Sequence, residues 1–274
     1  MVTEKNKVNI KNILFHLDKD KFHEVEKKAI VDLSDLNRNY RIKSDIFSII
    51  KRIDNLHLLV FPIEDEQLNA FTIFRNEKSF IYVNSYLPLN LQIFAATHEF
   101  YHNKYNKGSQ ELLEDVESKF NGDINEMVAN SYAACLLVPR IHLEDEMNIL
   151  NITKGNIGLI DILKLMDSFA VPYKAMVLRL FETGFLTEDE ANEFLKIQDK
   201  NPKEGVALKI IESRIGVRWE VRTREIEFSN LIQLAVDNFE DANFSAQKII
   251  DDLSGIGVSE EIVSLFIEGD LSGK

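Results

Sequence analysis

Hydrophobic residues recur at two different spacings in the first third of this chain. Isoleucines between residues 42 and 53 repeat every three or four positions, which predicts a helix over about 43–54. The next run, Leu56 to Ile63, is short, apolar and rich in β-forming residues, so it predicts a strand. Two further strand-like runs flank Asn76-Glu77-Lys78 and predict a β-hairpin.

The middle and the end of the chain follow the helical spacing. One helix is predicted between Asn90 and Lys107, where the chain has no Gly or Pro, and a second over Asp123 to Val138, stopped by Pro139. Beyond residue 150 the pattern predicts a helix, a Val-Pro turn and another helix. The helical pattern continues over Glu188 to Leu195, and the last 70 or so residues are expected to be mostly helical.

The order of these elements predicts an α+β fold. We expect a zincin-like core with a small, partly antiparallel sheet packed on helices, flanked by helical regions at both ends. The predicted parts are an N-terminal helical segment at 1–37, with Ile13, Leu14 and Leu17 on one helix face, and a core at 38–150. A helix-turn-helix-like segment at 151–197 and a helical region at 198–274 follow.

Composition narrows the possible functions. The formal net charge of −13 over 274 residues argues against a general nucleic-acid coat, because phosphate binding depends on clustered Lys and Arg. The one cysteine, Cys135, excludes a disulfide within the chain. The first residues are polar, and no apolar run approaches the roughly 18 residues of a membrane span. We therefore expect a cytoplasmic protein with no membrane partner.

The candidate chemistry lies in His98-Glu99-Phe100-Tyr101-His102. Two histidines four residues apart lie one turn above each other on the same helix face, where both can bind one zinc ion. Glu99 lies beside them and can take a proton from a water on that ion. The alternative is the solvated face of an ordinary helix. The apolar turn that precedes His98 favours the metal site, because ionisable groups on a buried helix are costly unless they are paired or bound to metal.

A third protein ligand must come from another element. Glu126 is a candidate, since Ala129, Ala133 and Ala134 give its helix a small-residue surface that allows close approach. Glu126 also lies three residues after Asp123, which is the spacing of a capping box. Spacing alone leaves both interpretations of Glu126 open.

Two stretches, VNSYLPLNLQIFAATHEFYH and NEMVANSYAACLLVPR, resemble the ImmA/IrrE family of zinc metallopeptidases. The resemblance covers about 40–190 and departs mildly from the family pattern at 94–97. It implies that His98, His102 and Glu126 bind one zinc ion per chain and that Glu99 is the general base. It also implies a regulatory endopeptidase whose protein substrate is a helix-turn-helix repressor. Asn130 matches the family pattern as well, and we interpret it as a residue of helix packing.

Two other functions are weighed against the endopeptidase. The first is a zinc-stabilised module that binds a repressor without cutting it. The second is direct DNA binding through the helix pair around Val171-Pro172. Its second helix offers only Lys174 and Arg179 as cations, which favours packing on the core over DNA recognition. An oxyanion that forms during peptide hydrolysis could be stabilised by Tyr101, Tyr105 or His142. The sequence does not select one of these three residues.

Overall fold

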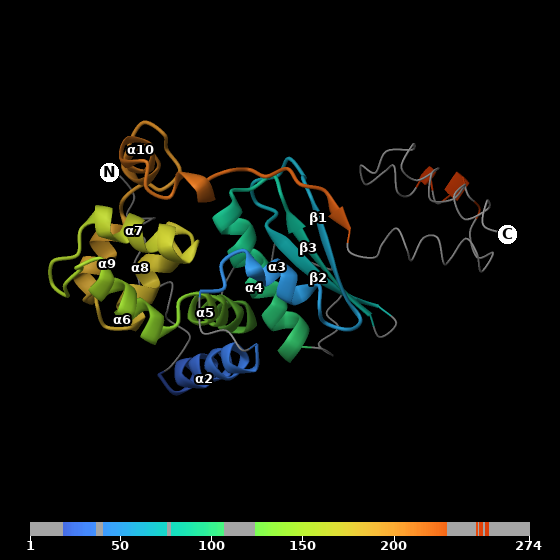
Figure 1. Ribbon diagram of the computed structural model, residues 1–274, viewed down its shortest axis with the longest axis horizontal. Helices are drawn as coiled ribbons and strands as arrows, with labels where there is room; N and C mark the ends of the chain where they lie inside the picture. The colour runs from blue at the N-terminus through green and yellow to red at the C-terminus, as the bar shows by residue number, and fades with distance from the viewer. Residues whose placement is uncertain are drawn as a thin grey trace, which may run out of the picture.

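A four-stranded sheet carries helices on one of its faces, and the other described helices lie beyond them on the same side (Figure 1). This computed structural model describes residues 19–36, 41–75, 78–106 and 124–228, and residues 245, 247, 248, 250 and 251. The predicted helix face of Ile13, Leu14 and Leu17 lies outside these residues, as does most of the helical region predicted after residue 228.

Helices dominate the described part of the chain. The α-helices are α2 (Lys19–Asp35), α3 (Asp45–Ile50), α4 (Leu89–Tyr105), α5 (Ile124–Leu137), α6 (Arg140–Ile149), α7 (Leu159–Phe169), α8 (Tyr173–Glu182), α9 (Glu188–Leu195) and α10 (Gly205–Ser213). The strands are β1 (Leu56–Phe61), β2 (Ala70–Arg75), β3 (Lys78–Asn84) and β4 (Glu227–Phe228). No helix within these described residues is long and apolar enough to cross a membrane.

The sheet is mixed, with the strand order β2-β3-β1-β4. Strand β3 pairs antiparallel with β2, as the predicted hairpin requires, and parallel with β1. Strand β4 pairs antiparallel with β1 on the other side. Helices and a small, partly antiparallel sheet therefore combine as expected, and the predicted α+β fold class is confirmed.

One face of the sheet is covered by α3 and α4. Alternate strand residues such as Leu58, Ile81 and Val83 point to this side and are fully buried. Helix α4 packs on β2 and β3, and α3 packs on β1 and α4. Helix α5 then packs on the opposite side of α4, so α4 lies between the sheet and a second helix. This position explains why α4 is buried on several sides.

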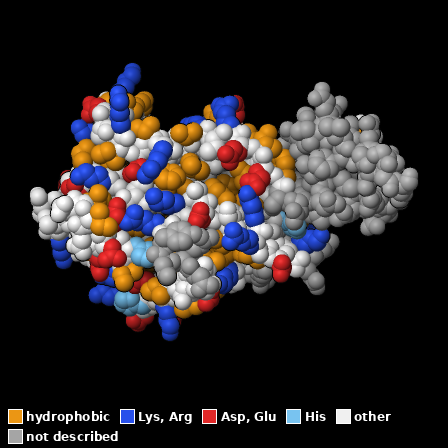
Figure 2. Space-filling model, viewed as in Figure 1, with side chains coloured by type: hydrophobic (Ala, Val, Ile, Leu, Met, Phe, Trp, Pro, Cys, Tyr) orange, Lys and Arg blue, Asp and Glu red, His pale blue; other side chains and the backbone are white. Residues whose placement is uncertain are grey.

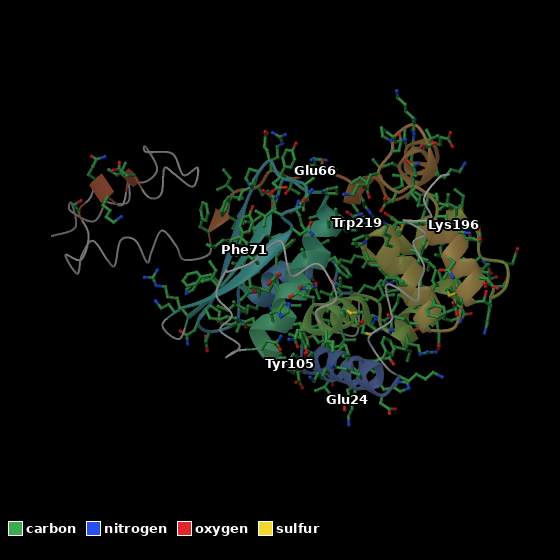
Figure 3. All side chains as sticks on the ribbon, turned by 180° about the vertical axis from the view of Figure 1, so that it is seen from behind. Glu24, Glu66, Phe71, Tyr105, Lys196 and Trp219 are labelled. Atoms are coloured by element: carbon green, nitrogen blue, oxygen red, sulfur yellow. The ribbon has the colours of Figure 1, made fainter. Side chains whose placement is uncertain are left out.

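Small residues let α4 and α5 approach each other closely. Ala96 of α4 and Ala129 and Ala133 of α5 have no exposed surface. Helix α2 lies across this helix pair, where its buried Asp32 accepts hydrogen bonds from the hydroxyl groups of Tyr105 and Tyr132. Figure 3 shows Tyr105 at the end of α4 beside α2. The three helices therefore form one tightly joined layer.

Helix α8 is joined to this layer by a buried arginine. The side chain of Arg179 is 1% exposed, and its Nε donates to the carbonyl oxygen of Val138 at 2.9 Å. Its other nitrogens lie 2.9 Å from Glu26 of α2 and 3.3 Å from Glu182. The helix pair α7 and α8 therefore packs on the core, and Arg179 has no surface to offer a phosphate. Lys174 lies 3.3 Å from Asp199.

The segment after α10 differs from the mostly helical region expected there. Up to Phe228 it runs largely extended over the start of α4 and then along the sheet as β4. The amide of Leu89 donates to the carbonyl of Val221, and the amide of Arg224 donates to that of Ser85, both at 3.0 Å. Such a segment takes its conformation from backbone partners elsewhere in the fold, so its own sequence has no strand periodicity. Helix α6 was not predicted either. The division into four parts stays a prediction.

The two cations of α8 should differ sharply in their effect on stability. We expect Arg179→Ala to lower the free energy of unfolding by about 3–5 kcal/mol, because it leaves Glu182 and Glu26 without their buried partner. The matched control Lys174→Ala removes an exposed ion pair and should change it by no more than about 1 kcal/mol. Urea unfolding of both variants measures this. Equal effects would contradict the structural role of Arg179.

Candidate metal centre

Three side chains from two helices converge on one point. The Nε2 atoms of His98 and His102 on α4 lie 3.0 Å apart. The carboxylate of Glu126, in the first turn of α5, reaches both rings. Its oxygens lie 3.0 Å from Nε2 of His98 and 3.3 Å from Nε2 of His102. Among the residues that the structure describes, this is the one group of three or more His, Cys, Asp or Glu side chains that could hold a metal ion.

These distances fit a tetrahedral zinc ion. Zinc binds imidazole nitrogen and carboxylate oxygen at about 2.0–2.2 Å, so two ligands of a tetrahedron lie about 3.3 Å from each other. The three separations of 3.0, 3.0 and 3.3 Å are close to this value. Two histidines and one glutamate also form the donor set of a catalytic zinc site, in which a fourth position stays open. The residues present therefore fit the ion that the sequence predicts.

The charges at the site also suit a cation. Burial by itself lowers the pKa of His98, but the hydrogen bond to Glu126 and the charges of Glu99 and Glu126 outweigh burial and raise it. The same hydrogen bonds, from His102 and then His98, hold the pKa of the Glu126 carboxyl far below its usual value. Glu126 is thus ionised, which is the form that binds a metal.

Asn130 fixes the orientation of His98. Its Oδ1 lies 2.9 Å from Nδ1 of His98 and can only accept, so Nδ1 is the donor, and Nε2 is the ring nitrogen that faces Glu126 and would bind a metal ion. The prediction that Asn130 serves helix packing is wrong, because this side chain is exposed and faces the histidine. A partner on the second ring nitrogen of a metal-binding histidine is the usual way to fix its tautomer.

The other histidine has an amide neighbour too. Nδ1 of His102 lies 3.1 Å from the Nδ2 atom of Asn106. Coordination through Nε2 leaves the proton on Nδ1, and this proton needs an acceptor. In this structure Asn106 presents its amide nitrogen to Nδ1, and the amide would have to be turned for its oxygen to accept that proton.

Glu99 lies beside the three converging side chains, and a residue of the sheet holds it in place through a hydrogen bond. Glu99 as a whole is 9% exposed, and its carboxylate accepts a hydrogen bond of 2.7 Å from the hydroxyl of Thr72 on β2. Thr72 pairs with Ile81 across the hairpin and therefore points to the α4 side of the sheet. Sequence reasoning missed Thr72, since the run AFTIFR shows a strand but gives no sign of what its residues face.

None of the three candidates for an oxyanion residue is among the three converging ligands, although the ring of Tyr101 lies edge-on to that of His102 at a centroid distance of 5.9 Å. Tyr101 packs between the rings of Tyr105 and Tyr132, at centroid distances of 5.2 and 5.1 Å. The hydroxyl of Tyr105 is occupied by Asp32. His142 lies on α6 beside Arg41 and Asp145, and burial lowers its pKa. The capping-box interpretation of Glu126 depends on Asp123, which lies outside the described residues.

An α+β core that brings together two histidines, a glutamate and a neighbouring carboxylate defines the class of metal-dependent hydrolases. The family model for the IrrE N-terminal-like domain, Peptidase M78, matches residues 54–181. Comparisons with curated proteins and with solved structures give no match. The matched segment contains every residue of the site, and the resemblance to the ImmA/IrrE family is confirmed over these residues.

Removal of the Asn130 amide should weaken zinc binding without unfolding the protein. We expect Asn130→Ala to reduce zinc affinity about 10- to 100-fold, the usual cost of losing a partner of a ligating histidine. Competition with a chromogenic chelator measures this, with Asn148→Ala, an exposed asparagine on α6, as the control. Unchanged affinity in Asn130→Ala would show that Asn130 does not orient His98.

Proposed function

We propose that this protein is a zinc-dependent endopeptidase that cleaves a helix-turn-helix repressor in the cytoplasm. His98, His102 and Glu126 hold one zinc ion per chain, and Glu99 is the general base. The observation that carries the proposal is the convergence of three ligand atoms within hydrogen-bonding distance, beside a carboxylate that none of them uses. The family match supports the peptidase class, and the repressor is carried over from the resemblance.

The residues at the site have different roles in the proposed reaction. When bound, zinc would polarise the peptide carbonyl and lower the pKa of water. Thr72 occupies one oxygen of Glu99 and so leaves the other free to accept the proton of the attacking water. Asn130 keeps His98 in the tautomer that binds metal. The charge of Glu126 balances the ion.

The edge of the sheet suits an extended peptide as substrate. Strand β2 ends the sheet in the order β2-β3-β1-β4, so one side of its backbone has no partner strand among the described residues. Thr72 connects the same strand to Glu99. A peptide that adds to such an edge gains main-chain hydrogen bonds without any sequence requirement. It would then lie along the strand that holds the base.

Direct DNA binding has weaker support. Arg179 is buried in a network with Glu26 and Glu182, and Lys174 pairs with Asp199. Figure 2 shows acidic and basic side chains mixed over the visible face, not a continuous basic surface. The net charge of −13 points the same way. A non-cleaving binding module remains the second candidate, because the same zinc site could serve only to join α4 and α5.

Glu99→Gln separates the enzyme from the binding module. The substitution keeps the shape of the side chain and all three ligands but removes the proton acceptor. We expect normal zinc content and a cleavage rate lower by a factor of about 10²–10⁴. Cells from which the native gene has been deleted receive wild type, Glu99→Gln or the exposed control Glu144→Gln at equal levels, and new protein N-termini are quantified by mass spectrometry.

Wild type and Glu144→Gln should produce the same cleavage products, and Glu99→Gln should not. Equal products from Glu99→Gln would refute the role of Glu99. If wild type co-purifies with an intact repressor and never creates a new N-terminus, the binding module is correct and the endopeptidase is not.

A further inference from the structure

The sheet has a second face, which is unusually apolar. Residues that alternate with the buried set point away from α3 and α4, as the strand registers show. We call this surface the outer face; its main members are Leu59, Phe61, Phe71, Ile73, Phe80 and Phe228. Aromatic contacts run across it. The ring of Tyr82 lies 4.5 Å from that of Phe61 and 4.8 Å from that of Phe71.

A sheet face in contact with water normally carries polar residues between the buried ones. The outer face instead carries large apolar residues on every strand, and Ile73 is 37% exposed. The strand-packing helices of the described chain, α3 and α4, lie on the other side. A contiguous apolar surface of this kind marks a place where another segment or molecule binds.

We propose that the C-terminal residues 229–274 of the same chain dock on the outer face. The segment begins directly beside the outer face, because it follows β4 in the chain. Strand β4 is the last described element before it, and the ring of Phe228 lies 5.8 Å from Phe61 in the aromatic row.

The sequence of this segment is suited to the surface. Leu231, Leu234 and Ala235, and later Ile262, Leu265 and Phe266, follow the spacing of an apolar helix face. The segment also has nine Asp or Glu residues against two Lys. This acidity is complementary to Arg75 and Lys78, which end β2 and begin β3 at one end of the sheet.

Distance and concentration both favour this occupant. The outer face extends from β4 to β2 over three strand spacings, or about 14 Å. A helix of about ten residues spans that width. A tethered segment acts at an effective concentration of the order of millimolar, which exceeds the concentration of a second copy or of a free partner in most settings. The segment in the same chain therefore binds first.

Docking there would also act on β2. Phe71 and Ile73 belong to the outer face, and Thr72 between them holds Glu99 on the inner side. A covered outer face would thus stabilise the strand that positions the base. This link to Glu99 rests on the proposed function, whereas the docking itself does not.

Photo-crosslinking in the full chain tests the docking. The photoreactive residue p-benzoylphenylalanine replaces Phe71, an aromatic for an aromatic, and in a control protein it replaces Ile141, which is 65% exposed on α6. We expect crosslinks within one chain from position 71 to peptides of 229–274, and none from position 141. A crosslinked band of twice the mass would assign the outer face to a second copy. A lack of any crosslink to 229–274 would equally overturn the proposal.

A second variant tests the docking without the photoreactive residue, in case that residue disturbs folding. Ile73→Asp places an unpaired charge on the outer face, so hydrogen exchange in 229–274 should become about tenfold faster or more. Exchange in α7 and α8 should stay unchanged, and Ile73→Val should behave like wild type. If Ile73→Asp leaves exchange in 229–274 unchanged while α7 and α8 show a native fold, the segment does not dock there. Zinc content is measured on the same samples, so loss of the proposed function would be seen separately.

Discussion

The close contact between α4 and α5 is the constraint on which the rest of the site depends. The imidazoles of His98 and His102 come from one helix and the carboxylate of Glu126 from the other, yet their atoms lie about 3 Å apart. Helices that face each other across large side chains cannot bring short polar groups so near. Fully buried alanines on both helices remove this obstacle. The sheet on one side of α4 and α2 across the pair then hold the contact in place.

Polar residues buried around this contact have distinct tasks. Asp32 joins α2 to Tyr105 of α4 and to Tyr132 of α5. Arg179 joins α8 to α2 and to the end of α5. Both are charged groups with several hydrogen-bonding partners, and burial of such a group is tolerated only when its partners stay in place. They therefore fix the relative positions of helices that apolar contacts alone would leave free to slide.

The sequence predicts well the part of the site that depends on a single helix. The spacing of His98 and His102 places both on one helix face, because that relation depends on the helix alone. Glu126 stayed open from spacing, since its position depends on how two helices meet. Asn130 was misassigned although it lies one turn after Glu126 on the same face, which is a usable signal. No signal in the sequence indicated a role for Thr72, because the sequence of a strand does not show which helix its residues face. Strand β4 is too short for any periodicity.

Zinc X-ray absorption spectroscopy on the purified protein tests the central claim most directly. The account predicts about one zinc per chain, with only nitrogen and oxygen neighbours at about 2.0–2.2 Å and the multiple-scattering signature of two imidazoles. This signature should fall to that of one imidazole in His102→Ala. A protein that binds no zinc under any loading condition, or whose zinc has sulfur neighbours or no imidazole, would contradict the account.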